Sequence, residues 1–159
     1  MSERYLYDYI YPRIAVGGID SYRRDFEHFG FTLNVAFEVQ RWGLQDTPFL
    51  ANVPNLQHVP LDDCNDMDKC LEQAPAVQNA VSLLKEAVED GHCCLVSCYA
   101  GRNRSALVVT EYLIQTGMAP DVAIAHMQSR RKNTLGNEAF VAWLKRPRDT
   151  KACERLQTT

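Results

Sequence analysis

The sequence HCCLVSCYAGRNRSALVVTEYLI, residues 92–114, decides the fold of this chain. Its first part, residues 92–97, is nearly all apolar, which is typical of a central strand buried on both faces. Residues 105–114 are apolar almost all round, so they predict a buried helix. A buried strand that passes through a short glycine-containing turn into a buried helix is typical of an α/β layered fold.

The turn between this strand and this helix runs from Cys98 to Arg104. A turn wrapped around a central point aims successive backbone N–H groups inward, and the following helix adds the positive end of its dipole. Gly101 permits the backbone angles that such a turn needs. The segment therefore predicts a cradle for a tetrahedral oxyanion such as phosphate. The residues of this phosphate loop are Tyr99, Ala100, Gly101, Arg102 and Asn103.

Cys98 and Arg104 are the candidate reactive residues of this loop. The field that attracts an anion also favours a thiolate, so we expect Cys98 to attack phosphorus at neutral pH. Arg104 can offer a planar fork of donors to two phosphate oxygens, a geometry that lysine cannot supply. A buried cysteine at a strand end is usually only a small hydrophobic residue. The prediction of a cysteine-dependent phosphatase therefore depends on strand, cysteine, glycine, arginine and helix occurring in this order.

The departing oxygen needs a proton, and the acidic segment DDCNDMD, residues 62–68, contains candidate donors. This segment follows a short predicted strand at residues 56–61, and a loop at that strand end can reach the phosphate loop. An acidic loop is more often only solvated surface. The residues alone do not choose among its aspartates.

The remaining segments fit one domain over residues 1–146, with a polar tail over residues 147–159. An amphipathic helix is predicted from Pro75 to Gly91, and Pro120 opens another helix at its favoured first position. The alternation of strands and helices predicts a central, mostly parallel sheet of about four to five strands flanked by helices. Further strands are predicted at residues 13–18 and 31–37, and further helices at residues 19–29 and 137–145.

Composition narrows the class of protein. The chain has 159 residues, 46% of them hydrophobic, so it can fill one core. Its formal net charge of -3 gives no bulk attraction to nucleic acid or acidic membrane. No apolar stretch approaches the ~20 residues that span a bilayer. Irregularly spaced cysteines without a signal peptide favour an intracellular reducing compartment, cytoplasmic or nuclear. The scattered histidines predict no metal site, and we expect no cofactor.

At this point the chain resembles the small atypical dual-specificity phosphatases of the cysteine-based protein tyrosine phosphatase superfamily, over residues 10–144. The segments that carry the resemblance occur in the family's order: IYPRIAVGG, FTLNVAFE, VPLDD, SCYAGRNRSALVVTEYLI and NTLGNEAFVAWL. The resemblance implies the α/β fold of that family and hydrolysis of phosphate monoesters through a phosphocysteine intermediate.

The resemblance also implies roles for individual residues and marks two departures. In the family a histidine precedes the cysteine and helps to order the loop, whereas this chain has Ser97. A proline usually precedes the asparagine that lies near the loop, whereas this chain has Gly136. The implied roles are nucleophile for Cys98, phosphate binding for Arg104, general acid for Asp63 with Asp62 as the alternative, assistance to breakdown of the intermediate for Ser105, and supporting hydrogen bonds for Asn137.

Phosphorylated proteins, with phosphotyrosine and phosphoserine or phosphothreonine, are the first expectation for the substrate, because small members of the family most often act on them. Arg102 raises phosphoinositides as an alternative, since lipid-directed relatives carry a basic residue there. Asn103 before Arg104 resembles the loop of relatives that act on RNA 5′ ends. A pseudophosphatase that only binds phosphorylated partners is kept open by Ser97. A rhodanese-like sulfurtransferase also uses a cysteine-headed anion loop but has no need for the acidic segment.

Overall fold

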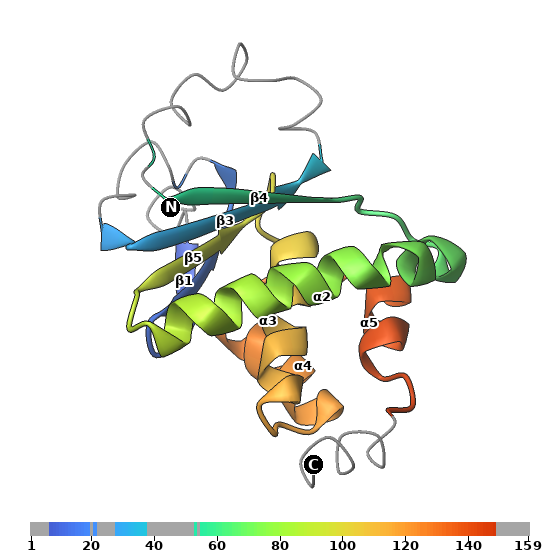
Figure 1. Cartoon of the computed structure of the whole chain (residues 1–159). Helices are drawn as coiled ribbons and strands as arrows, with labels where there is room; N and C mark the ends of the chain where they lie inside the picture. Colours follow the sequence, from blue (N-terminus) through green and yellow to red (C-terminus); the bar gives the residue numbers. More distant parts are fainter. Residues whose placement is uncertain (1–6, 20, 22–27, 38–52, 54, 149–159) are drawn as a thin grey trace, which may run out of the picture.

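The computed structural model describes residues 7–19, 21, 28–37, 53 and 55–148. The strands are β1 (Tyr7–Tyr11), β2 (Ile14–Gly17), β3 (Phe31–Ala36), β4 (Leu56–Leu61) and β5 (Cys94–Ser97). They form one sheet in the order β1-β2-β5-β3-β4 (Figure 1). Only the β1–β2 pairing of this sheet is antiparallel; β2, β5, β3 and β4 run parallel. The predicted mostly parallel sheet is therefore confirmed.

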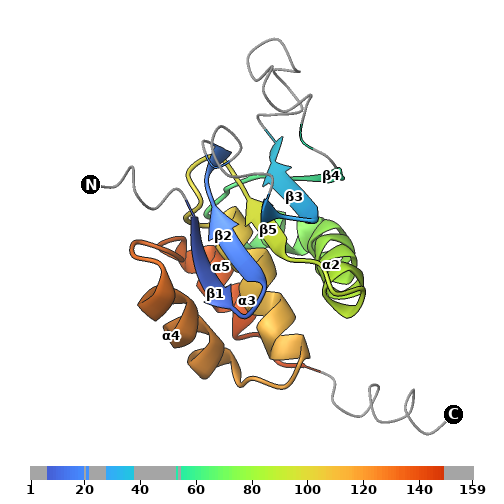
Figure 2. The same ribbon diagram turned by 90° about the vertical axis from the view of Figure 1, so that its left-hand side faces the viewer.

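The described helices gather on one side of this sheet, where α2 and α3 pack side by side (Figures 1 and 2). They are α2 (Met67–Glu89), α3 (Arg104–Gln115), α4 (Pro120–Arg130) and α5 (Glu138–Leu144). The first residue of α4 is Pro120, as predicted, because a proline at this position gives up an N–H that has no partner within the helix. None of the helices within the described residues is long and apolar enough to cross a membrane.

β5 is the middle strand, and all four of its residues are buried. Such a position explains the nearly unbroken apolar run, because both faces of the strand lie in the core. The parallel register pairs Ser97, the last residue of β5, with Gly17 on one side and Asn34 on the other. The chain then enters the loop that begins at Cys98, at the carboxyl edge of the sheet. Ligand sites of open α/β sheets lie at this edge.

Two elements differ from the sequence-based expectation. β1 was not predicted; in the structure Ile10 is buried while Tyr9 and Tyr11 are exposed, as on a half-buried edge strand. The helix expected from Pro75 begins eight residues earlier, at Met67. Its N-cap is Asp66, whose carboxylate accepts a hydrogen bond from the Asp68 N–H at 3.0 Å.

Pro75 lies in the interior of α2, with helical residues on both sides of it. A proline there removes one helical hydrogen bond. The carbonyl group that loses its partner is that of Leu71, an exposed residue, so water can bind there. The predicted helix at residues 19–29 falls largely outside the described residues, as does the long connection expected at residues 40–55.

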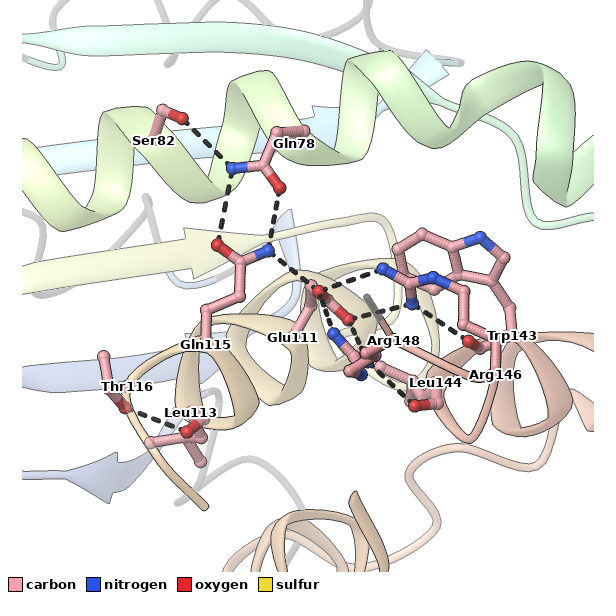
Figure 3. Close-up of polar contacts among 10 residues, drawn as sticks. All are labelled: Gln78, Ser82, Glu111, Leu113, Gln115, Thr116, Trp143, Leu144, Arg146 and Arg148. Carbon is pink, nitrogen blue, oxygen red and sulfur yellow. Dashed lines mark hydrogen bonds and ion pairs between the residues drawn. The ribbon is translucent and has the colours of Figure 1, made fainter. Parts of the chain in front are cut away.

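The C-terminal end of the domain is fixed to α3 by the buried carboxylate of Glu111, which is 1% exposed at its side chain (Figure 3). Nη1 and Nη2 of Arg148 each donate to it at 2.7 Å, and Nη1 and Nη2 of Arg146 each donate at 3.2 Å. Burial by itself raises the pKa of Glu111, but the hydrogen bonds from Arg148, Arg146 and Gln115 outweigh it and hold that pKa below its ordinary value.

The same cluster extends to α2, because Gln115 exchanges hydrogen bonds with Gln78 at 2.7 and 3.4 Å (Figure 3). The guanidinium of Arg146 also stacks on the ring of Trp143 at 3.7 Å. Arg148, the second residue of the polar tail expected from residue 147, is therefore bound to α3 and to the end of α5. Residues 149–159 of that tail lie outside the described part of the chain.

Candidate active site

Cys98 follows β5 directly, and its side chain is only 2% exposed. The Gly101 N–H donates to its sulfur at 3.2 Å, and the Ser105 hydroxyl lies 3.2 Å from the same atom. Gly101 belongs to the turn, whereas Ser105 is in the first turn of α3. The predicted nucleophile and the predicted assisting hydroxyl are therefore in contact. Both partners can donate a hydrogen bond to a sulfur anion.

The phosphate loop packs tightly on the backbone at the end of β2. Cys98 donates its N–H to the Gly17 carbonyl at 3.3 Å. Gly101 has a φ of +71°, and a Cβ placed on it would lie 2.4 Å from the carbonyl carbon of Gly17. A Cβ on Gly18 would lie 2.9 Å from the Tyr99 carbonyl oxygen. Both Gly101 and Gly18 are therefore required by close approach, and Gly101 also by its backbone angle.

Arg131, directly after α4, supports the outer side of the phosphate loop. Its Nε donates to the Gly101 carbonyl at 2.7 Å, and its Nη2 donates to the Ala100 carbonyl at 3.4 Å. Its Nη1 forms an ion pair with Asp8 of β1 at 2.8 Å. Arg131 therefore binds the carbonyl groups of two residues of the loop, Ala100 and Gly101, while the Gly101 N–H faces the Cys98 sulfur. Arg131 was not predicted as a residue of the site, since nothing in the sequence distinguishes it from its basic neighbours Arg130 and Lys132.

The segment between α4 and α5 is also tied to the loop. Leu135 donates its N–H to the Arg102 carbonyl at 2.9 Å. Leu135 and Asn133 both have positive φ angles, 58° and 61°. A positive φ is uncommon for leucine and persists only where the surroundings impose it. Here the buried Leu135 side chain and the bond to the loop impose it.

Arg104 opens α3 and is buried. Its Nη1 donates to the Leu61 carbonyl, the last of β4, at 3.1 Å. The guanidinium group is therefore anchored at the strand end that precedes the acidic segment. This anchor fixes its orientation relative to the loop that it closes.

Asp63, in the acidic segment, is bound to the phosphate loop through its carboxylate. Asn103 Nδ2 donates to Asp63 Oδ2 at 3.1 Å, and Asn137 Nδ2 donates to Asp63 Oδ1 at 2.9 Å. Asp62 is held differently, through its backbone. Its N–H donates to Gln73 Oε1 at 2.8 Å, and its carbonyl accepts from Gln73 Nε2 at 3.0 Å.

Asn137 links three segments of the site. As the N-cap of α5 it accepts the Phe140 N–H at 3.1 Å with its Oδ1. Its Nδ2 also donates to the Cys64 carbonyl at 2.8 Å, and its backbone N–H donates to Asn103 Oδ1 at 3.2 Å. The residue expected to support the loop thus contacts the acidic segment and the loop together.

Ser97 occupies the position before the nucleophile and is fully buried. Asn34 Nδ2 donates to the Ser97 hydroxyl at 3.1 Å, and Asn34 Oδ1 accepts the Ala36 N–H at 3.0 Å. A buried amide must find hydrogen-bond partners, so this pair satisfies polar groups under the loop. The hydrogen bond between Asn34 and Ser97 thus supports the end of β5, at the position where the family pattern has a histidine.

Comparisons with known proteins agree with this geometry. Residues 23–149 match the family described as the dual specificity phosphatase catalytic domain. Human DUSP28 is 24% identical with a TM-score of 0.69, covering 96% of this chain and 95% of that one. A mouse putative dual specificity phosphatase, crystallised with zinc tungstate, is 26% identical with a TM-score of 0.68, covering 96% and 89%.

A third solved structure is the human tyrosine phosphatase-like serine/threonine/tyrosine-interacting protein. It is 17% identical with a TM-score of 0.67, covering 96% of this chain and 97% of that one. A comparison with curated protein sequences gave no match. The family match spans the acidic segment, the phosphate loop and α5.

Proposed function

Because the chain belongs to the dual specificity phosphatase catalytic-domain family of cysteine-based phosphatases, we propose that Cys98 hydrolyses phosphate monoesters in two steps. The observation that carries the proposal is the sulfur of Cys98, held 3.2 Å from both the Gly101 N–H nitrogen and the Ser105 hydroxyl. The family assignment also argues against the sulfurtransferase alternative.

In the first step the Cys98 thiolate forms a bond to phosphorus while the bond from phosphorus to the leaving oxygen breaks. The electron pair of that bond goes to the leaving oxygen, which takes the proton of the general acid. The inward-facing N–H groups and Arg104 bind the equatorial oxygens, where negative charge is spread during transfer. Arg131 contributes indirectly, because it binds the carbonyl groups of two loop residues.

In the second step water attacks the phosphocysteine and gives its proton to the same acidic residue, now acting as a base. The sulfur–phosphorus bond breaks, and its electron pair returns to Cys98 as thiolate. Ser105 lies where its hydroxyl can donate to that sulfur as it leaves, at 3.2 Å. Inorganic phosphate is the second product.

Asp63, and not Asp62, is the general acid in this proposal. The carboxylate of Asp63 is bound to the phosphate loop, while the hydrogen bonds of Asp62 with Gln73 use its backbone. We expect Asp63→Asn to remove the basic limb of the pH–rate profile and Asp62→Asn to leave it in place. The reverse result would assign the acid to Asp62.

Phosphorylated proteins are the proposed substrates, carrying phosphotyrosine and phosphoserine or phosphothreonine. The exposed side chain of Arg102 lies in the loop, so phosphoinositides and RNA 5′ phosphates are competing substrates for the same test. The mouse relative crystallised with tungstate supports an oxyanion as the ligand, because tungstate has the tetrahedral shape of phosphate. The need for a free thiol supports action in a reducing intracellular compartment, cytoplasmic or nuclear.

The test is phosphate release by the wild type and by Cys98→Ser from phosphotyrosine peptide, phosphothreonine peptide, phosphoinositide and 5′-triphosphate RNA. We expect release that depends on Cys98, greatest from a phosphopeptide. Release greatest from the lipid or the RNA would replace phosphoprotein as the substrate. No release from any of them, with phosphopeptide still bound, would identify a pseudophosphatase.

A further inference from the structure

We propose that Asn103 is a positioning residue for proton transfer: its side-chain amide holds the carboxyl group of Asp63 at the phosphate loop. The inference deepens the proposed function and rests on it. Asn103 lies in the phosphate loop, immediately before the phosphate-binding Arg104. Its hydrogen bond to Asp63 therefore ties the acid to the loop. Asp63 was predicted from the sequence to take part in proton transfer, whereas Asn103 was predicted only as a residue of the phosphate loop.

The orientation of both amides that face Asp63 is fixed by backbone groups. Asn137 must turn its oxygen to the Phe140 N–H, which can only donate, and its nitrogen to the Cys64 carbonyl, which can only accept. Asn103 must turn its oxygen to the Asn137 backbone N–H. Each amide therefore presents an N–H, and not a carbonyl, to Asp63.

Asn103 lies at a position where an asparagine side chain normally caps a helix, but here the side chain binds Asp63. It is the N-cap residue of α3, and asparagine is favoured there because its side chain accepts from the first helical N–H groups. In this structure Asn103 forms no side-chain cap bond. The amide instead spans from Asp63 to the backbone of Asn137, at 3.1 and 3.2 Å.

The two asparagines around Asp63 have separable functions. Asn137 caps α5 and binds the Cys64 carbonyl, so its loss would also disturb the local fold. The side-chain bonds of Asn103 go to Asp63 and to the Asn137 N–H. Substitution of Asn103 therefore tests the position of the acid more directly.

A displaced acid has a specific chemical signature. A leaving group that is a weak base departs without a proton, whereas a strongly basic one needs the proton as its bond breaks. Loss of acid placement therefore slows the reaction of phenyl phosphate much more than that of p-nitrophenyl phosphate. A defect in phosphate binding or in the nucleophile would slow both reactions alike.

The experiment measures kcat/KM for both esters in the wild type, Asn103→Ala, Asn103→Leu and Asp63→Asn. We expect the ratio of the p-nitrophenyl to the phenyl value to rise about tenfold or more in both Asn103 variants, in the direction of Asp63→Asn. Asn103→Leu keeps the side-chain volume, so it covers the case in which Asn103→Ala folds poorly. Melting curves by circular dichroism establish that each variant is folded.

The matched control is Asn65→Ala. Asn65 tethers the same acidic segment to α5 by accepting the Ala139 N–H at 3.0 Å, and the bonds to the Asp63 carboxylate come from Asn103 and Asn137. Its ratio should stay within about threefold of the wild type. A wild-type ratio in both Asn103 variants, or an equal rise in Asn65→Ala, would overturn the assignment. Absence of Cys98-dependent release even from p-nitrophenyl phosphate would instead overturn the proposed function itself, and the assignment with it.

Discussion

At the scale of single residues, Gly101 combines three demands that only glycine meets. Its φ is +71°, its N–H donates to the Cys98 sulfur, and a Cβ at this position would lie 2.4 Å from the Gly17 carbonyl carbon. Real Cβ contacts are never so short, so any side chain there must move the backbone of β2 or of the loop. Either movement displaces the N–H that faces the sulfur.

We therefore expect Gly101→Ala to reduce kcat about 100-fold or more and to lower the free energy of unfolding by about 1–3 kcal/mol. Phosphate release and a urea melt measure the two effects. Gly136→Ala is the control, because a Cβ there meets no atom within 4 Å and its φ is not positive. It should leave both quantities near wild type; an equal loss in the two variants would contradict the explanation.

At the scale of elements, the phosphate loop is shaped by segments that lie far from it in the sequence. Arg131 holds two loop carbonyls and is itself held by Asp8 of β1. An edge strand, a helix end and the loop therefore form one polar unit. The side chain of Arg131 is 12% exposed, so water does not readily replace these bonds.

For this reason Arg131→Ala should lower kcat/KM about 10- to 100-fold, because the loop carbonyls lose the donors that bind them. Arg131→Lys should recover only part of the rate, since one ammonium cannot reproduce the fork of a guanidinium. Steady-state kinetics with p-nitrophenyl phosphate measure both variants. Arg130→Ala, at the exposed end of α4, is the control and should remain close to wild type. Full activity of Arg131→Ala would show that the loop keeps its shape unaided.

The elements also show which features local sequence can predict. β4 occupies the predicted residues 56–61, and α4 begins at the predicted Pro120, because runs of apolar residues and a helix-opening proline act over a few positions. The start of α2 was wrong because a cap at Asp66 outweighed the proline. β1 was missed because its burial depends on α4, whose His126 bonds the Ile10 carbonyl at 2.7 Å.

The candidate site divides in the same way. The loop from Cys98 to Arg104 is contiguous, so its spacing in the sequence already predicted a phosphate cradle. The contact of Asp63 with Asn103 joins residues 40 positions apart, and that of Arg131 with Asp8 joins residues 123 positions apart. Only the assembled fold brings such pairs together, and no local pattern marks them.

At the scale of the whole molecule, Glu111 joins α3, the end of α5 and the chain after it, and through Gln115 also α2 (Figure 3). A buried carboxylate is stable only when it is paired. Arg146 and Arg148 keep partial contact with solvent, at 32% and 24% exposure, so the cluster is less costly to form than a fully buried ion pair.

This cluster predicts how stability depends on pH. The pKa of Glu111 is lower in the folded chain than in the unfolded one, so its contribution is fully present above the unfolded pKa of ~4.3 and is lost as pH falls through the folded value. Glu111→Gln should lower the free energy of unfolding by about 2–3 kcal/mol at pH 7. The difference between variant and wild type should shrink as the pH is lowered through and below ~4.3.

Urea melts at several pH values measure this difference. Asp121→Asn is the control, since its ion pair with Lys145 is exposed, with side chains 84% and 51% accessible. It should cost less than about 1 kcal/mol at any pH. A Glu111→Gln effect that is equally small, or that does not change with pH, would contradict the role of the cluster.

The contacts of Asp8 with Arg131 and of Asn137 with Asp63 join residues that are synthesised at different times. Asp8 leaves the ribosome long before its partner Arg131, and Asn137 is synthesised 39 residues after Cys98. At about 5–20 residues per second this second interval lasts roughly 2–8 s. During that time the nascent chain carries Cys98 without the residue that later joins the acidic segment to the phosphate loop. The acidic segment and the phosphate loop therefore cannot be joined through Asn137 before the start of α5 has been made.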